Sequence, residues 1–336
     1  MSVQTPEHLT DLVTQALVRA NTGEANARCV ARALVAADLD GLASHGVSRL
    51  PSYADQAASG KVDGHAQPAV ETPAPAVVRV DARCGFAFPA IETGMERALA
   101  VLSDTGVAAL AVRNSHHFGV AGHHVEHAAE HGAVALAFGN SPAAIAPWGG
   151  SRAVFGTNPI AFATPRRDEP PLVVDLSLSK VARGKVMVAR DRGEAIPEGW
   201  AQDAQGKPTT DPAAVLDGGT MLPLGDAKGA ALALAVEILA AGLTGARFGF
   251  EASSFFTAHG TPPRVGQLFI LLDPVRLAGA DYAERLSHLL QAITAQSGAR
   301  LPGERRLRNR ARRRQEGIDV PVPLLEEIRR RAGVPA

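Results

Sequence analysis

VAALAVRNSHHFGVAGHHVEHAAEHGAVALAF, residues 107–138, is the stretch that decides the fold class. Its two short apolar runs, 107–112 and 133–138, are predicted to be buried strands, since each is continuous and bounded by turn residues. Residues 123–131 between them are predicted to be a helix. A polar turn at 113–119 joins the first strand to this helix. The stretch therefore predicts alternating strands and helices, with polar side chains exposed at a strand–helix junction.

The same alternation continues on both sides of this stretch. We predict further short strands at 77–80, 160–163, 172–175 and 267–273. Helices are expected at 6–20, 25–40, 47–60, 92–105, 180–191, 229–242, 281–296 and from 304 to at least 314. Residues 63–75 are predicted to be a linker or loop, because they are rich in glycine and proline, and 197–220 are predicted to be loop-rich. Short strands mixed with helices predict an α+β or mixed α/β protein.

Composition excludes several classes of protein. The chain has 336 residues, 46% of them hydrophobic, and a formal net charge of zero, so no global field favours nucleic acid or an anionic membrane. Cys29 and Cys84 are the only cysteines and form no C-x-x-C pair, which argues against a disulfide framework or a thiolate metal site. The N-terminal residues lack the pattern of a signal peptide, and the longest apolar run, 229–243, contains Glu237. We expect a cytoplasmic, enzyme-sized protein.

Three familiar site motifs are missing from the sequence. There is no G-x-G-x-x-G following a strand, no G-x-x-x-x-G-K-[ST] and no G-x-S-x-G. A Rossmann dinucleotide site, a P-loop NTPase and an α/β-hydrolase all lose support. A protein of this sequence that binds NAD(P) must do so with another fold.

Two glycine-bounded turns carry the main candidate residues. In 40–49, Ser44 and His45 are adjacent, and Arg49 follows one helical turn later, where it is able to bind a carboxylate close to them. In 113–119, His116 and His117 lie between a strand and a helix, where a histidine is able to exchange a proton near neutral pH. The alternative interpretation is two polar turns with a satisfied core histidine and a surface arginine.

The helix after the second turn offers a rival from another class of enzyme. His127, Glu130 and His131 match H-x-x-E-H, in which the two histidines share a helical face as zinc ligands do. A zinc hydrolase is therefore the alternative outside oxidoreductases. No downstream segment clearly offers a third ligand, so we predict no metal ion and favour a solvated helical face.

Two weaker signals lie further along the chain. Residues 155–160 place small polar groups among glycines, where the backbone is able to approach a ligand. Residues 298–306 form an arginine-rich, glycine-bounded turn that suits phosphates, and the arginines continue to Arg314. From Arg310 onward we favour a solvated basic helix.

Taken in order, these motifs resemble the malate/L-lactate dehydrogenase type of NAD(P) oxidoreductases. The resemblance runs from about residue 36 to 327. It is carried by Ser44-His45-Gly46 with Arg49, by His116-His117-Phe118-Gly119, by residues 155–159, by Asp175, by 223–229 and by 301–303. It implies a non-Rossmann α/β fold, with a largely antiparallel nucleotide-binding sheet and a discontinuous helical domain. We expect the helical domain at 1–65 with 297–336, the NAD(P)-binding and catalytic domain at 66–296, and a homodimer.

The resemblance also implies roles for individual residues. His117 is the expected proton donor and acceptor, with His45 and Ser44 beside the reacting atom, and Arg49 and Thr157 are the expected substrate anchors. The expected cofactor contacts are Asn140, Asp175, Leu176, Ser177, Lys228, Gly303, Glu304, Arg305 and Arg306. Arg305 and Arg306 suit a 2′-phosphate, which favours NADP over NAD. The expected partner is a small 2-oxo or 2-hydroxy acid.

Within this family the sequence looks most similar to the (2R)-3-sulfolactate dehydrogenases, in residues 173–187 and 245–256. Reduction of Δ1-piperideine-2-carboxylate or Δ1-pyrroline-2-carboxylate is the second expectation, and oxidation of malate or L-lactate is the third. A sulfonate requires an extra cationic or amide site. Lys180, Arg183 and Lys185 are candidates for that site, and the sequence does not choose among them.

Overall fold

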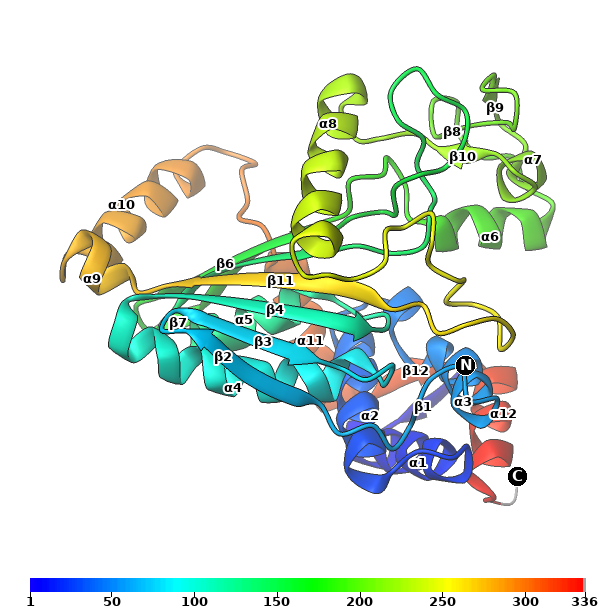
Figure 1. The fold of residues 1–336 in the computed structure, drawn as a ribbon, viewed down its shortest axis with the longest axis horizontal. Coiled ribbons are helices and arrows are strands. Elements are labelled where there is room, and N and C mark those ends of the chain that lie inside the picture. Colours follow the sequence, from blue (N-terminus) through cyan, green and yellow to red (C-terminus); the bar gives the residue numbers. More distant parts are fainter. Residues whose placement is uncertain (335–336) are drawn as a thin grey trace.

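The computed structural model describes residues 1–334, and a seven-stranded sheet forms its centre (Figure 1). The strand order is β2-β3-β4-β11-β5-β6-β7. The strands are β2 (Ala69–Ala74), β3 (Val77–Asp81), β4 (Val107–Ser115), β5 (Val134–Gly139), β6 (Ile160–Arg166), β7 (Glu169–Leu176) and β11 (Val265–Leu272). Only β3 and β4 pair in parallel, and every other pair is antiparallel. The predicted mixed α/β fold with a largely antiparallel sheet is confirmed.

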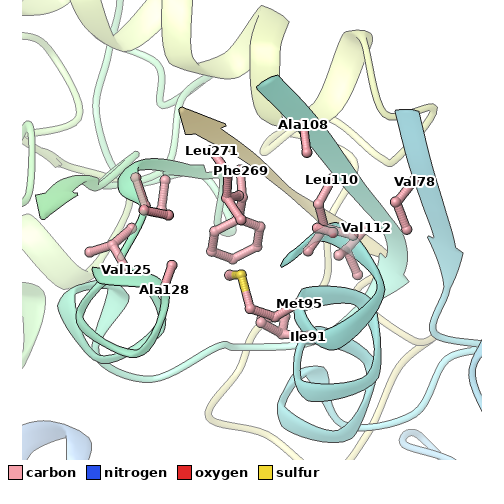
Figure 2. Packing of buried hydrophobic residues seen from close by; sticks show 14 of the residues in the cluster. Val78, Ile91, Met95, Ala108, Leu110, Val112, Val125, Ala128, Phe269 and Leu271 are labelled. Atoms are coloured by element: carbon pink, nitrogen blue, oxygen red, sulfur yellow. The ribbon is translucent and has the colours of Figure 1, made fainter. Parts of the chain in front are cut away.

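Two helices cover one face of this sheet. α4 (Ala87–Thr105) crosses over between β3 and β4, and α5 (Ala121–Glu130) connects β4 to β5. Figure 2 shows Ile91 and Met95 of α4 and Val125 of α5 facing Phe269 of β11. Residues such as Met95 and Phe269 are almost completely buried. Burial of each such side chain contributes roughly 1.5–3 kcal/mol, so this core fixes where the 113–119 turn emerges.

A second hydrophobic core joins the two ends of the chain. It lies among α1 (Pro6–Arg19), α2 (Glu24–Leu39), α3 (Leu50–Ala58) and α12 (Val322–Ala332). Thr5 caps α1 by accepting a hydrogen bond from the His8 backbone N–H at 3.2 Å. β1 (Ser2–Gln4) pairs antiparallel with β12 (Ile318–Val320). Both ends therefore pack together, as a discontinuous helical domain requires, and the boundaries at 65 and 297 stay a prediction.

A smaller third core lies above the sheet. It contains α6 (Arg183–Arg192), α7 (Pro212–Leu216) and the two-residue strands β8 (Ala201–Gln202), β9 (Pro208–Thr209) and β10 (Thr220–Met221). α8 (Asp226–Glu237) follows, and a π-helical turn continues it through Ile238–Gly242. Residues 197–220, predicted to be loop-rich, contain only β8, β9, α7 and the first residue of β10, and the rest of this stretch is loop. The prediction of 63–75 as linker was wrong at β2, which contains Pro73 and tolerates it because β2 is an edge strand.

The remaining helices follow β11. α9 (Pro274–Ala278) and α10 (Tyr282–Thr294) project from one end of the sheet, and α11 (Glu304–Glu316) returns to pack against α2 (Figure 1). Two short 3₁₀ turns, Ala43–His45 and Val47–Arg49, join α2 to α3. Among residues 1–334, no helix combines the length and the apolar character needed to cross a membrane.

Candidate active site

A cavity of about 790 Å³ opens where the helical core meets the edge of the sheet. It collects segments that are far apart in the chain: the 42–49 turn, the 117–122 turn, the ends of β5 and β7, the start of α6, the 249–256 loop and the turn before α11. Most of the residues predicted from the sequence line it: Ser44, His45, Arg49, His117, Asn140, Thr157, Asp175, Leu176, Ser177 and Gly303 to Arg306.

The turn that carries Ser44 and His45 is held from beneath by Asp38. A carboxylate oxygen of Asp38 accepts a hydrogen bond from the Val47 backbone N–H at 2.7 Å. Gly46 lies directly over this carboxylate, and a Cβ there would come within 2.2 Å of it. Glycine is therefore required at position 46 because of a close approach, although its φ is negative.

His45 is neutral at physiological pH. Its Nδ1 lies 2.9 Å from the Ser44 hydroxyl, and its ring stacks on that of His117 with centroids 5.5 Å apart. Burial, followed by the nearby charge of Arg49, lowers the pKa of His45 to about 4. A neutral His45 beside His117 supplies a hydrogen-bonding group to the cavity without adding charge.

His117 is paired with a tyrosine that the sequence did not indicate. The Tyr53 hydroxyl of α3 lies 2.5 Å from Nδ1 of His117, and Tyr53 is completely buried. Burial raises the pKa of Tyr53 far above its usual range, so the phenol keeps its proton. Burial, followed by Arg49 and His45, lowers the pKa of His117 well below 6.5. Nε2 of His117 has no protein partner within residues 1–334 and is the nitrogen free to meet a substrate.

His116, the neighbouring histidine, is directed into the protein. Its Nε2 lies 2.8 Å from the amide oxygen of Gln56, and both side chains are buried. Burial, followed by the charge of Lys61, lowers the pKa of His116 to about 3. The two histidines therefore separate in role: His116 supports the turn, and His117 faces the cavity.

Arg49 is oriented so that one end of its guanidinium is free. Its Nε donates to the Ser44 carbonyl oxygen at 2.7 Å, and its Cζ lies 4.6 Å from the centre of the Phe256 ring. The two terminal nitrogens have no partner among the described residues. A planar fork fixed in this way is suited to a carboxylate that binds with both oxygens.

Asn140 lines the cavity and is held by hydrogen bonds to three other segments. Its amide donates to Glu237 at 3.0 Å and to the Arg247 carbonyl oxygen at 2.9 Å, and it accepts from the Gly266 N–H at 2.9 Å. Asn140 is buried, so these hydrogen bonds fix its side chain in the cavity wall, and its contact with a cofactor stays a prediction. Glu237 also accepts from Asn158 at 2.8 Å and from the Gly249 N–H at 2.7 Å, which ties together three segments that line the cavity.

Asp175 ends β7 opposite the start of α5. One of its carboxylate oxygens accepts a hydrogen bond from the Gly122 N–H at 2.7 Å. Burial raises the pKa of Asp175, and this hydrogen bond partly offsets the rise. Its other oxygen has no partner within residues 1–334 and remains available to a hydroxyl group of a ligand.

Arg306 lines the cavity, and its guanidinium is paired with two carboxylates. It lies 3.0 Å from Asp40 and 2.6 Å from Glu126. Arg310 binds the same two carboxylates at 2.6 and 2.8 Å, and His123 contacts Asp40 at 2.8 Å. The expectation of a solvated helix from Arg310 onward was therefore wrong for Arg310. Arg305 is exposed and has no ion-pair partner among the described residues, so it is a free cation at this end of the cavity, as is Arg300.

Comparison with known proteins identifies the family. The family model described as malate/L-lactate dehydrogenase matches residues 4–329. The chain belongs to the malate/L-lactate dehydrogenase family. A (2R)-3-sulfolactate dehydrogenase (NADP(+)) of Chromohalobacter salexigens is 57% identical to it over 303 residues, which are 90% of each chain. The family resemblance read from the sequence is confirmed, and the chain is a dehydrogenase or reductase.

Solved structures of the family share this fold. The Δ1-piperideine-2-carboxylate reductase of Pseudomonas syringae pathovar tomato is 41% identical, with a TM-score of 0.93 over 98% of this chain and 100% of that one. A sulfolactate dehydrogenase of Methanocaldococcus jannaschii is 32% identical, with a TM-score of 0.89 over 99% and 98% of the two chains. This chain, which has no Rossmann fingerprint, therefore shares its fold with a reductase and a dehydrogenase of solved structure.

Two sets of residues that the sequence analysis considered lie apart from this cavity: Lys228 and the histidines of the zinc alternative. Lys228, in the first turn of α8, is not among the residues that line it. The ring centroids of His127 and His131 lie 4.5 Å apart, and Nδ1 of His131 lies 2.8 Å from the His127 carbonyl oxygen. Within residues 1–334 no three histidine, cysteine or acidic side chains are grouped to hold a metal ion, so the zinc alternative has no third ligand.

Sequence reasoning missed several residues that shape this site in the family fold. Tyr53 and Gln56 lie on one face of α3, where they read as ordinary core positions. The ammonium group of Lys61 donates to the carbonyl oxygens of Ser254, Thr257 and His259 at 2.7, 2.9 and 3.1 Å. No local motif indicates these contacts, because the partners of Tyr53 and Gln56 in the 113–119 turn lie 64 and 60 residues away, and those of Lys61 lie 193 to 198 residues away.

Proposed function

We propose that the protein is an NADP-dependent oxidoreductase that interconverts a small 2-hydroxy acid and the corresponding 2-oxo acid, with (2R)-3-sulfolactate and 3-sulfopyruvate as the favoured pair. One observation carries the reaction type: the free end of Arg49 and the free Nε2 of His117 open onto the same cavity. A carboxylate anchor beside a proton-exchanging group is what such a substrate requires. The 57% identical relative named for this activity supports the substrate.

Arg49 anchors and orients the acid. Its two terminal nitrogens bind the C1 carboxylate, and the half-buried Thr157 lines the cavity with them. Contact with Phe256 and the bond to the Ser44 carbonyl oxygen restrict the rotamers of Arg49, so little conformational entropy is lost on binding. The C2 oxygen is then directed toward His117 and His45.

His117 exchanges the proton of the C2 oxygen through Nε2. Before the acid binds, its ring is neutral, because burial and the positive charge of Arg49 disfavour the imidazolium. A carboxylate bound to Arg49 cancels that positive charge and raises the affinity of His117 for a proton. The Tyr53 hydroxyl suits both states, since it donates to an unprotonated Nδ1 and accepts from a protonated one.

The other end of the cavity fits a pyridine dinucleotide. When bound, the nicotinamide supplies or accepts the hydride at C2. The free carboxylate oxygen of Asp175, the 175–177 turn and the backbone of Gly303 would hold the cofactor, and the unpaired Arg305 suits a 2′-phosphate. Asn140 and Arg306 act indirectly by fixing the cavity wall.

The test is an absorbance assay that follows the oxidation of NADPH or NADH by the purified protein. We expect NADPH oxidation with 3-sulfopyruvate, at a kcat/KM above those for oxaloacetate and pyruvate. His117→Ala should remove most turnover, because general acid–base catalysis contributes about 10²–10⁴-fold, while NADPH binding stays near normal. Wild-type turnover of the His117→Ala variant would overturn the assignment of the proton donor.

A second candidate is reduction of the cyclic imines Δ1-piperideine-2-carboxylate and Δ1-pyrroline-2-carboxylate. The 41% identical reductase, which superposes with a TM-score of 0.93, favours it. These substrates also present a carboxylate beside the reacting carbon, so Arg49 and His117 serve either reaction. Including the piperideine carboxylate in the same assay separates the two, because a higher kcat/KM for the imine would replace sulfopyruvate as the substrate.

We also propose that the protein forms a homodimer through α8 and works in the cytoplasm. After its charged first turn, the exposed face of α8 and of the π-helical turn that continues it is apolar: Ala231, Leu232, Leu234, Ala235 and Ile238. A continuous apolar face of this kind is typical of an interaction surface. Both cysteines are free thiols, as expected in a reducing compartment. Light scattering should give twice the chain mass, and Leu234→Glu with Ile238→Glu should give a monomer.

A further inference from the structure

The substrate end of the cavity contains a second cation that the proposed reaction does not use. Arg183, the first residue of α6, lines the cavity together with Ala182 and Gly184. A Cβ built on Gly184 would lie 3.8 Å from Cβ of Ser44, so the start of α6 packs directly against the Ser44–His45 turn. Arg183 therefore reaches the cavity on the side of the reacting atoms.

The guanidinium of Arg183 has no counter-charge. It makes no ion pair or side-chain hydrogen bond within residues 1–334, and burial alone lowers its pKa, with no acidic neighbour to offset the change. Leaving a half-buried arginine unpaired costs free energy, and an anionic ligand would recover that cost. The first-turn N–H groups of α6 add to the positive potential here, since no side chain caps this helix.

The structure also separates Arg183 from the two neighbouring cations. Lys180 pairs with Asp226 at 3.1 Å and is not among the residues that line the cavity. Lys185 is exposed and lies outside the cavity lining as well. Of the three, only Arg183 faces the site with its charge free.

We propose that Arg183 binds a second anionic group, carried on C3 of the substrate, and thereby selects substrates with an acid at each end. This inference rests on the proposed function, in which Arg49 holds the C1 carboxylate. The other charged residues of the cavity lining lie in the segments proposed to hold the cofactor, Asp175 in the 175–177 turn and the rest in the turn before α11 and its first residues: Arg300, Glu304, Arg305 and Arg306. Arg49 and Arg183 are left as the charges that meet the substrate. A sulfonate and a carboxylate on C3 share the required charge, and a planar guanidinium is able to bind either.

The kinetic test compares Arg183→Met with wild type on 3-sulfopyruvate, oxaloacetate and pyruvate. We expect kcat/KM to fall roughly ten- to hundredfold for the two C3 acids, as loss of a charge-assisted hydrogen bond predicts, and to change less than about threefold for pyruvate. Lys185→Met is the matched control, since it removes one positive charge from the exposed side of the same helix, and it should behave as wild type. The larger of the two losses identifies the preferred C3 group as sulfonate or carboxylate.

A binding measurement keeps the inference independent of turnover. In calorimetry with the NADPH-loaded protein, 3-sulfopropionate should bind more tightly than propionate, and Arg183→Met should remove that difference. If Arg183→Met lowered kcat/KM equally for pyruvate and 3-sulfopyruvate, or for neither, the role of Arg183 would be overturned. Wild-type protein that reduces pyruvate faster than both C3 acids would also overturn it, and would replace the favoured substrate pair while leaving the proposed reaction type intact. A protein that reduces none of the 2-oxo acids would contradict the proposed function. If the same protein also bound propionate and 3-sulfopropionate with equal affinity, the role of Arg183 would be contradicted as well.

Discussion

The Tyr53 hydroxyl and Nδ1 of His117 lie 2.5 Å apart, although 64 residues separate them in the chain. The contact connects the helical core, which holds α3, to the turn at the end of β4. Tyr53 is completely buried, so its hydroxyl has His117 as its hydrogen-bond partner within residues 1–334. Tyr53 therefore fixes the orientation of the His117 ring and leaves Nε2 for the substrate.

Replacing Tyr53 by phenylalanine should reduce kcat about ten- to hundredfold, with a smaller effect on KM. The variant removes the one partner that Nδ1 has among residues 1–334, and a hydrogen bond to a charged ring is worth roughly 1.5–3 kcal/mol. The other tyrosine, Tyr282, bonds to Thr164 at 2.7 Å away from the cavity, so Tyr282→Phe is a matched control. A purely structural role for Tyr53 would lower the melting temperature without moving the pH profile of kcat, and that result would contradict the positioning role.

The pH dependence of hydroxy-acid oxidation should report the shifted pKa of His117. Oxidation requires a neutral base, and the pKa of His117 before substrate binds is lowered well below 6.5. Activity measured as kcat/KM should therefore stay constant as the pH falls through 6.5 and decline only in more acidic solution. Because the bound carboxylate cancels the charge of Arg49, kcat should decline at a higher pH than kcat/KM does. Inflections in the opposite order would refute this coupling.

Much of the fold was predictable because apolar periodicity reports burial directly. The runs at 107–112 and 133–138 became β4 and β5 with small changes at their ends, and Gly106 ends α4 with a left-handed φ of 75°. The elements that were missed contain weak local signals. β1 and β12 are three residues long and are stable only through each other, so neither has a periodicity of its own.

The candidate site was predictable where residues are placed by their own turn and not where they depend on distant partners. Ser44, His45 and His117 occupy glycine-bounded turns, and the structure brings them together. The side-chain amide of Asn140 donates a hydrogen bond to Glu237, 97 residues away. The guanidinium of Arg306 donates one to Asp40, 266 residues away. No local pattern distinguishes an arginine that awaits a phosphate from one that is already paired.

Lys61→Met should loosen the loop that covers the cavity. The variant keeps most of the buried alkyl stem but removes the three hydrogen bonds to Ser254, Thr257 and His259. Since this loop carries Phe256, which contacts Arg49, we expect KM for the acid to rise several-fold and proteolysis between 250 and 262 to become faster. Lys207→Met, on the surface, is the control. Unchanged proteolysis together with an unchanged KM would show that the loop is held by other contacts.

Asp40→Asn should destabilise the protein and weaken cofactor binding together. Asp40 is fully buried between Arg306, Arg310 and His123, and removing one charge from such a network typically costs about 3–5 kcal/mol. The network anchors α11, whose first turn forms part of the cofactor end of the cavity. Denaturant unfolding should give a lower free energy of unfolding, and NADPH titration should give a higher Kd. Asp319→Asn, at an exposed position, should leave both values unchanged. If Asp40→Asn lowered stability but left the Kd for NADPH unchanged, the ion-pair network would not support cofactor binding, and this prediction would be contradicted.

Arg305→Ala should reduce the preference for NADPH over NADH. Arg305 is exposed at the start of α11 and lines the cavity, and unlike Arg306 it has no ion-pair partner among the described residues. A 2′-phosphate would gain one charge-assisted contact from it, so we expect KM for NADPH to rise roughly tenfold or more, with KM for NADH nearly unchanged. Arg308→Ala is the control, because Arg308 is exposed on the same helix but does not line the cavity. An equal rise for both cofactors would mean that Arg305 binds a part common to NADH and NADPH, and the 2′-phosphate would then need another partner, with the nearby Arg300 the next cation to test.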